Sequence, residues 1–308
     1  MNNSMNMPEL SANEVKQAIL QIENADFEKL NIEDFERYLT SLLRGYALTA
    51  PKIPPGTYLY RGRICQKPKN IKEMTYPPTE TVKECGRANT AGETFFYAAA
   101  AREVPFFELG AKKGEHIALS RWRTTDTLFV NHIGFSKKCG EQLGSNRKLD
   151  EIYDFVKSTR AHGDLNSLVH DYLALKFSKS IMPGEEQYYR LTIAISRKLF
   201  KSDLFSGLLY PAIAMAGNAD NIVLKKEFVD KSLEFKSIEY IEIKGMKDRQ
   251  YEIEILDSAT KMDQMGNFLW LGRRLHWQIK ENGGELTMKS ENGMWSAYDR
   301  DGNCVEPE

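Results

Sequence analysis

A glutamate and an arginine are the side chains of this chain whose settings best suit chemistry. Glu108 stands between Phe107 and Leu109, at the end of the apolar run V-P-F-F. A carboxylate in so apolar a setting either finds a partner or has its pKa raised, as happens at many active sites. Arg61 lies in the segment T-Y-L-Y-R-G-R-I, whose aromatic and β-branched residues are typical of a strand. A guanidinium stays charged and bonds two oxygens of a diphosphate at once.

Both residues also have an ordinary structural interpretation. Glu108 suits a surface carboxylate at a helix end, and Arg61 suits an exposed arginine on a strand. Perturbed carboxylates mark functional sites only as a tendency, because structural ion pairs perturb them too. The pattern alone therefore leaves both interpretations open.

Residues 86–109 are the stretch expected to position Glu108. The sequence G-R-A-N-T-A-G at residues 86–92 favours a tight turn, since Gly and Asn tolerate positive φ. The aromatic residues that follow predict a strand over residues 94–97. The four alanines at residues 98–101 predict a short helix, which Pro105 interrupts or restarts.

The rest of the chain alternates helical and strand patterns. Residues 8–50 predict two helices, capped by Ser11 and Asn31, whose apolar stripes suit packing against the main domain or a dimer contact. Helices are also predicted within residues 149–181 and over residues 187–200. Strand patterns occupy residues 57–64, 116–120, 127–130, 235–243 and 251–256, and the Gly-containing tail after residue 270 is typical of hairpins.

Composition excludes several classes of function. The chain has 308 residues, with 42 Lys and Arg against 43 Asp and Glu, so it carries no overall basic field for nucleic acid. Its four cysteines form no C-x-x-C pair and its five histidines lack metal-ligand spacing, so we expect no metal. No apolar run reaches the length of a membrane span, and the polar N-terminus lacks a signal-peptide core. These features predict a cytoplasmic protein without membrane contact.

Four motifs occur in a fixed order along the chain. They are L-Y-R-G-R around Arg61, G-R-A-N at residues 86–89 followed by F-F-Y-A, L-L-Y-P-A at residues 208–212, and D-N-I-V-L at residues 220–224. Together with Glu108 they resemble the RES domain, a family named for an arginine, a glutamate and a serine. The resemblance spans about residues 54–233. It departs at one position, because Ala212 stands where the family has its serine.

The resemblance implies an α+β fold. The expected core is a split sheet with flanking helices, similar to that of ADP-ribosyltransferases, with an N-terminal helical pair and a C-terminal β-rich extension. The corresponding domains are residues 1–50 for the helical extension, 51–245 for the RES-like catalytic domain and 246–308 for the β-rich extension.

The resemblance also implies an activity. Known members are toxins that consume NAD by phosphorolysis or hydrolysis of the nicotinamide–ribose bond, or that transfer its ADP-ribose to a protein or nucleotide. Many are held in check by a helix-turn-helix antitoxin. By this resemblance NAD is the substrate, Glu108 and Arg61 are the catalytic residues, and the residues that contact NAD are Arg61, Tyr97, Arg87, Asn221 and, at the serine position, Ala212.

Ala212 keeps a second class of function open. A chain that lacks the family serine can be an NAD-binding or interaction module with weakened catalysis. A serine hydroxyl supplies one hydrogen bond of about 1 kcal/mol, so its absence alone does not exclude an enzyme.

Overall fold

The computed structural model describes residues 11–47, 50–152, 163–200, 202–247 and 249–272, and the strands at residues 275–279, 287–291, 294–298 and 304–305. The chain divides into two compact units. The first comprises residues 1–57, 76–97 and 124–233, and the second comprises residues 58–75, 98–123 and 234–308. Each unit is therefore assembled from three separate segments of the chain.

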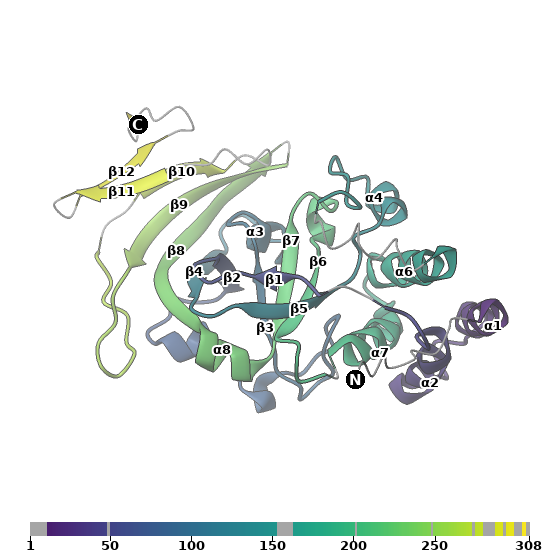
Figure 1. Ribbon diagram of the computed structural model, residues 1–308. Coiled ribbons are helices and arrows are strands. Elements are labelled where there is room, and N and C mark those ends of the chain that lie inside the picture. The colour runs from purple at the N-terminus through teal and green to yellow at the C-terminus, as the bar shows by residue number, and fades with distance from the viewer. Residues whose placement is uncertain are drawn as a thin grey trace. The chain divides into compact units, whose positions relative to one another are not determined.

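Two capped helices open the first unit (Figure 1). α1 (Ala12–Glu23) follows Ser11, whose side chain accepts a hydrogen bond from the backbone N–H of Glu14. α2 (Ile32–Leu42) follows Asn31, and a capping box joins Asn31 to Asp34. The structure thus confirms both helices and both N-caps that the sequence predicts.

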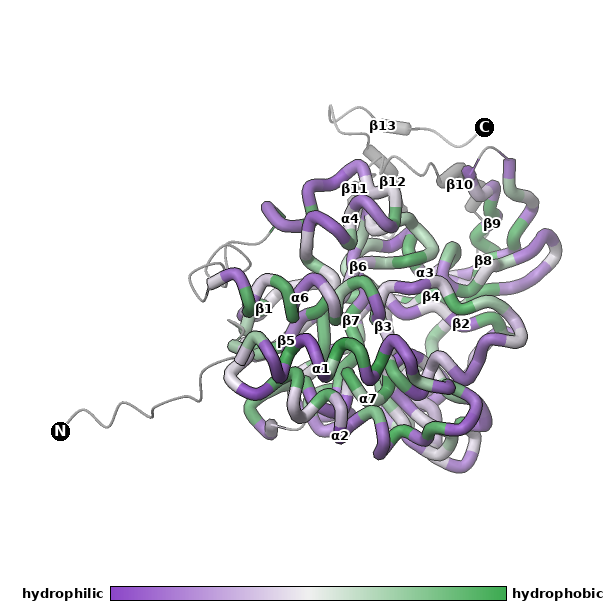
Figure 2. The backbone as a smooth tube through the Cα atoms, turned by 90° about the vertical axis from the view of Figure 1, so that its right-hand side faces the viewer, coloured by the Kyte–Doolittle hydropathy of each residue, from purple (hydrophilic) through white to green (hydrophobic). Residues whose placement is uncertain are grey.

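A single hydrophobic core joins these two helices to α6 (Asp164–Phe177) and α7 (Tyr189–Phe200). Phe35, Val169 and Leu191 are buried in it. Figure 2 shows hydrophobic and hydrophilic residues alternating along α1, as a helix with one face on a core requires. The N-terminal pair therefore packs within the first unit.

The other helical elements of the first unit are short. They are α4 (Lys137–Leu143), α8 (Lys226–Ser232) and 3-10 turns at Thr79–Thr81, Glu186–Tyr188 and Ile213–Met215. Residues 153–162, on which part of the predicted helical stripe falls, lie outside the described residues.

The sheet of the first unit has the order β1-β5-β6-β7. β5 and β6 run parallel, whereas β1 pairs with β5 and β7 pairs with β6 in antiparallel fashion. Every residue of β6 and β7 is buried, so this hairpin lies inside the unit. The bounds are β1 (Lys52–Ile53), β5 (Leu128–His132), β6 (Gly207–Pro211) and β7 (Asp220–Leu224).

The second unit carries an antiparallel arrangement in the order β2-β4-β8-β9-β10. β2 is paired to β4 along its whole length. The short helix α3 (Val104–Glu108) contributes Phe106 to a core with Ile241, Ile243 and Ile253. The bounds are β2 (Tyr58–Ile64), β4 (His116–Thr124), β8 (Leu233–Lys247), β9 (Gln250–Ala259) and β10 (Leu275–Ile279), with a 3-10 turn at Ile71–Glu73.

A separate three-stranded antiparallel sheet follows, formed by β11 (Thr287–Glu291), β12 (Met294–Tyr298) and β13 (Cys304–Val305). This pairing agrees with the hairpins predicted for the tail. The Gly-containing turns at residues 282–284, 292–293 and 301–302 lie outside the described residues.

The four alanines at residues 98–101 are not helical, contrary to the sequence prediction. Ala98 and Ala99 end β3 (Phe96–Ala99), where Ala99 pairs with Tyr60 of β2, and the helix begins only at Val104. The strand pairing overrides the helix propensity of alanine. Pro105 lies in the first turn of α3, where its missing N–H has no helical partner to lose.

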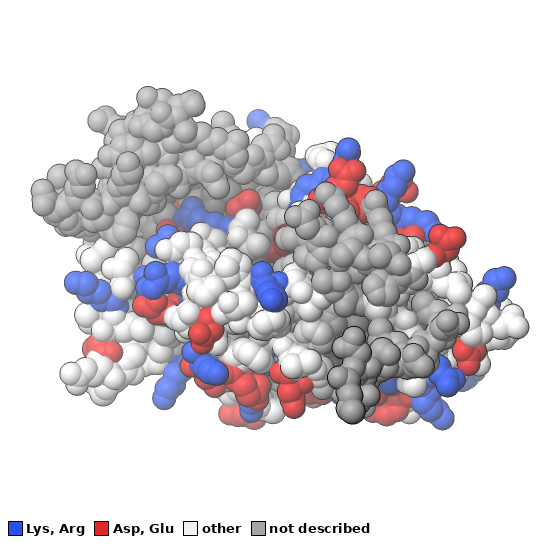
Figure 3. Space-filling view, viewed as in Figure 1, with Lys and Arg blue, Asp and Glu red and all other residues white. Residues whose placement is uncertain are grey.

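The fold is α+β, as the sequence predicts, with helices and mixed or antiparallel sheets in both units. Among the described residues no helix is both long and apolar enough to cross a membrane. Basic and acidic side chains are interspersed over the described part of the face drawn in Figure 3. This mixing matches the near-zero net charge of the sequence.

Candidate functional site

The G-R-A-N turn of the first unit is built around the hydroxyl of Tyr97. This hydroxyl donates a hydrogen bond to Oδ1 of Asn89 at 2.8 Å and accepts one from the backbone N–H of Ala88 at 3.1 Å. The backbone N–H of Gly86 closes the turn on the carbonyl of Asn89 at 2.9 Å. Ala88 and Asn89 are buried, so these bonds are shielded from water. The turn therefore fixes the position of Tyr97 on β3.

Gly86 has a steric reason for being glycine. A Cβ at this position would lie 2.6 Å from Oδ1 of Asn89 and 3.0 Å from the hydroxyl oxygen of Tyr97. Any other residue would thus displace the hydrogen bond between those two side chains. The glycine and the asparagine of the motif consequently serve one purpose, which is to hold the tyrosine.

Arg87 ties the same turn to two helices. Its guanidinium donates to the carbonyl of Phe177 at 2.6 Å and to that of Lys179 at 3.0 Å, at the C-terminal end of α6. Carbonyls at a helix end lack partners within the helix, and a guanidinium there satisfies them. The hydroxyl of Ser196, on α7, donates to the backbone carbonyl of Arg87 at 3.3 Å. Arg87 therefore acts here as an anchor for the turn.

Asn221 faces the same core as this turn. It lies directly opposite Tyr210 in the β6–β7 hairpin, and residues opposite each other share a face of the sheet. The ring of Tyr210 contacts that of Phe177 at a centroid distance of 5.4 Å. Tyr97 packs on the same core, so Arg87, Tyr97 and Asn221 converge on one region of the first unit.

Ala212 lies at the end of β6 in a closed backbone loop. Its N–H donates to the carbonyl of Ala219 at 2.7 Å, and its carbonyl accepts from the N–H of Gly217 at 2.8 Å. The residue is fully buried. The position that carries a serine in the family motif is therefore enclosed here by protein.

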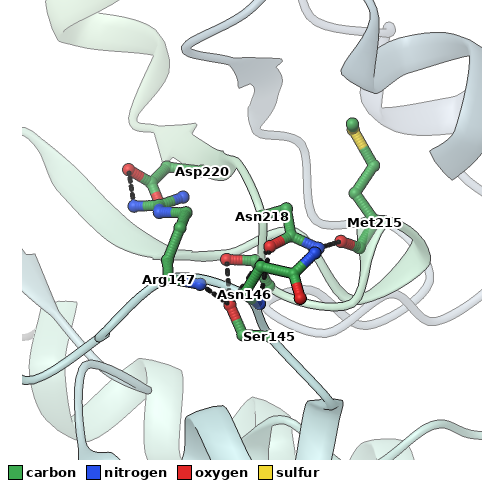
Figure 4. A network of polar contacts seen from close by, with 7 residues as sticks. Ser145, Asn146, Arg147, Met215, Asn218 and Asp220 are labelled. Atoms are coloured by element: carbon green, nitrogen blue, oxygen red, sulfur yellow. Dashed lines mark hydrogen bonds and ion pairs between the residues drawn. The ribbon is translucent and has the colours of Figure 1, made fainter. Parts of the chain in front are cut away.

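A polar network fixes the loop that contains Ala212 (Figure 4). Oδ1 of Asn218 accepts a hydrogen bond from the N–H of Asn146 at 2.9 Å, and the hydroxyl of Ser145 donates to the carbonyl of Gly217 at 3.2 Å. Arg147 and Asp220 form a two-pronged ion pair at 3.0 and 3.2 Å. The segment after α4 thus clamps the loop immediately before Asn221.

The sequence gives little local signal for this clamp. The segment at residues 145–147 is far from residues 218–220 in the chain, and neither stretch has a pattern that indicates an ion pair. The aspartate of the D-N-I-V-L motif was the one available sign, because a carboxylate in a buried strand requires a partner.

Arg61 lies on β2 of the second unit, where it is half-buried opposite Ser120 of β4. The hydroxyl of Ser120 donates to the carbonyl of Arg61 at 3.1 Å and accepts from the indole N–H of Trp122 at 2.9 Å. These bonds reinforce the pairing of β2 with β4. The backbone that carries Arg61 is therefore rigidly held.

Glu108 is the exposed last residue of α3, and α3 lies directly on β2. A Cβ on Gly62 would lie 2.7 Å from Cβ of Pro105 and 3.1 Å from Cδ1 of Leu109, so only glycine admits this approach. Successive side chains of a strand point to opposite faces. The side chain of Arg61 consequently leaves β2 on the face that α3 does not cover.

An ion pair secures the connection between β3 and α3. Nη2 of Arg102 lies 2.5 Å from Oε2 of Glu239 on β8. Burial opposes the charge of Arg102, but the carboxylate of Glu239 outweighs it and raises the pKa of the guanidinium. This contact sets the start of the helix that ends at Glu108.

The predicted site residues thus fall into two groups. Arg87, Tyr97, Asn221 and Ala212 belong to the first unit, and the structure brings the first three of them to one core. Arg61 and Glu108 belong to the second unit, on the adjacent elements β2 and α3, but the side chain of Arg61 leaves β2 on the face opposite α3.

No protein-family model, no curated protein and no solved structure matches this chain in the comparisons made. The functional argument therefore depends on the site residues and on their motifs.

Proposed function

We propose that this chain is a RES-type enzyme that cleaves the nicotinamide–ribose bond of NAD, on an ADP-ribosyltransferase-like fold. The observation that supports this most is the G-R-A-N turn. Each of its residues has a part in holding Tyr97 or in anchoring the turn, so the motif that carries the resemblance forms one physical unit. A rigidly held aromatic ring suits stacking on a nucleotide ring.

The chemistry assigns different tasks to the other residues. Cleavage of the nicotinamide–ribose bond develops positive charge on the ribose, as in glycoside hydrolysis. A carboxylate such as that of Glu108 stabilises this charge in the transition state. Arg61 holds the diphosphate with its planar guanidinium. Nicotinamide leaves with the bonding electron pair, and the acceptor oxygen forms the new bond to the ribose carbon.

The acceptor decides which product forms. Water gives ADP-ribose, phosphate gives a phosphorylated ADP-ribose, and a protein or nucleotide group gives ADP-ribosylation. Because NAD loss harms a cell, we expect the chain to slow growth when expressed alone. A helix-turn-helix antitoxin and a homodimer are the partners that this proposal includes, and the cytoplasm, where NAD is available, is the proposed location.

The burial of Ala212 favours a second candidate, an NAD-binding module with weakened catalysis. A serine hydroxyl that contacts NAD in the family has no counterpart at this enclosed position. Such a module would bind NAD without consuming it.

Incubation of the purified chain with NAD, with and without phosphate, separates these candidates. The enzyme reading predicts nicotinamide release in at least one of the two buffers, or labelled ADP-ribose on an added protein acceptor. NAD that binds but stays intact with water, phosphate and protein acceptors would support the binding module instead.

A further inference from the structure

The first unit contains a hollow that none of the proposed NAD residues lines. Its volume is about 590 Å³, within the range of small-molecule pockets. It lies between residues 92–95, the last turn of α7 and the start of α8. Four cationic side chains line it, namely Arg197, Lys198, Lys225 and Lys226.

Arg197 is balanced by carboxylates of the same unit. Its guanidinium lies 2.8 Å from Glu93 and 3.6 Å from Glu36. The carboxylate of Glu93 in turn accepts a hydrogen bond from the backbone N–H of Thr90 at 2.8 Å. Burial opposes the ionisation of Glu93, but the bond to Thr90 and the guanidinium of Arg197 outweigh it and lower the pKa of this carboxyl. These carboxylates therefore neutralise the charge that Arg197 brings to the hollow.

The positive charges of the three lysines are not neutralised by carboxylates in this way. The ammonium group of Lys198 donates to the hydroxyl of Thr40 at 2.6 Å, and that of Lys225 donates to the carbonyl of Ser202 at 3.0 Å. Both partners are neutral. Within the described residues neither these two lysines nor the exposed Lys226 has a carboxylate at ion-pair distance. Glu227 is the lining carboxylate that Arg197 does not engage.

The remaining lining is neutral and partly aromatic. Phe95 and Thr94 form one wall, and Thr79 contributes a hydroxyl. Cations beside an aromatic wall suit a ligand that joins a phosphate to a ring, since ammonium groups bind phosphate as point charges and a phenyl ring packs on a base. We propose that this hollow binds an organic phosphate of mononucleotide size. The site is separate from the NAD-cleaving residues and does not depend on that activity.

Calorimetric titration of the full chain with AMP at low salt tests this site. Lys226→Glu reverses a charge whose side chain is exposed, and we expect it to weaken AMP binding at least tenfold. Lys231→Glu is the matched control, because Lys231 is also exposed but lies in the last turn of α8 and does not line the hollow. We expect it to change affinity less than twofold. Lys226→Ala, with a smaller expected loss, replaces Lys226→Glu if the latter fails to fold.

Three results of the AMP titrations would overturn the proposal. They are no AMP binding by the unmodified chain, equal losses for the Lys226 and Lys231 variants, and AMP binding that Arg61→Ala abolishes while Lys226→Glu retains it. The last result would assign the nucleotide to the proposed NAD site. Titration with inorganic phosphate tests the ligand class. We expect inorganic phosphate to bind more weakly than AMP, and Lys226→Glu to reduce that binding as well. Inorganic phosphate that bound as tightly as AMP would contradict an organic ligand.

Discussion

At the scale of single residues, the hydroxyl of Tyr97 has a defined structural part. Its proton is donated to Asn89 and its oxygen accepts from Ala88, so the group is already engaged by the turn. Tyr97 would therefore act on a ligand through its ring rather than by giving up its proton. The hydroxyl and the ring can be tested apart.

Tyr97→Phe keeps the ring and removes both hydrogen bonds. It leaves the amide oxygen of Asn89 and the N–H of Ala88 without this partner in a buried setting, so we expect a loss of about 1–3 kcal/mol in the free energy of unfolding. Urea unfolding measures it. Tyr58→Phe is the control, since Tyr58 is exposed on β2, and it should cost much less. Equal stability of the Tyr97 variant and the unmodified chain would contradict the role of the turn.

Ala212→Ser tests the departure from the family motif. The side chain is fully buried and its backbone groups are already paired, so an added hydroxyl enters an enclosed space. We expect a destabilisation of about 1–3 kcal/mol without a gain in NAD affinity. If Ala212 lined the NAD pocket, affinity would instead rise by about fivefold, the value of one hydrogen bond of about 1 kcal/mol.

Two buried histidines, His132 and His170, should make the stability of the chain depend on pH. Burial lowers the pKa of His132 well below its usual value, and the nearby His170 adds to the decrease. Burial also lowers the pKa of His170, against opposing effects of the Phe135 carbonyl and Asp171. His170 is bonded to the hydroxyl of Tyr46 at 2.9 Å. Both rings are therefore neutral in the folded chain near neutral pH.

Acid should destabilise the chain for this reason. In the unfolded state both histidines titrate at about pH 6.5. Below that pH the unfolded chain binds protons that the folded chain does not, so stability is fully present above about pH 6.5 and falls toward the folded pKa values. Each histidine contributes up to about 1.4 kcal/mol per pH unit. Urea midpoints at pH 7.5 and 5.5 measure this, and His132→Leu should flatten the dependence.

At the scale of elements, the clamp on the β6–β7 loop is the main tertiary contact that local sequence does not reveal. The side chain of Asp220 is 8% exposed and that of Arg147 is 24% exposed, so the pair is largely shielded from water. Breaking a buried ion pair leaves one charge uncompensated and costs several kcal/mol.

Arg147→Ala should therefore destabilise the chain by about 3 kcal/mol, at the low end for buried pairs because Arg147 keeps some contact with water. Lys148→Ala is the neighbouring control. Lys148 pairs with Glu151 at the surface, where an ion pair contributes about 0–1 kcal/mol. Chemical unfolding of both variants gives the comparison, and similar losses would show that the clamp does not stabilise the loop.

Local elements were predictable where their signals are local. The caps at Ser11 and Asn31 follow from short-range hydrogen bonds, and β8 and β9 follow from the alternation of polar and apolar side chains. The alanines at residues 98–101 were not, because pairing of Ala99 with Tyr60, from a distant segment, decides their conformation. The structural roles of Arg87 and Arg147 could not be predicted for the same reason, because their partners also come from distant segments.

At the scale of the whole molecule, the chain builds two units from interleaved segments. Three of the crossings between the units fall within strands, namely β3, β4 and β8, where no linker marks them. The resemblance to the RES domain therefore indicated the α+β class, but nothing in the sequence indicated this division. The candidate site residues were identified from motifs, and the partition of those residues between the units became visible only in the structure.

Nicotinamide release by Glu108→Gln is the measurement that tests NAD cleavage most directly. The variant keeps the shape of an exposed side chain and removes the negative charge that would oppose a developing cation. We expect release to fall on the order of 10²-fold or more, with an unchanged melting temperature. Glu141→Gln, an exposed glutamate on α4, should retain full activity. Release by Glu108→Gln at the rate of the unmodified chain would contradict the role of Glu108, and intact NAD with the unmodified chain, whatever the acceptor, would contradict NAD cleavage itself.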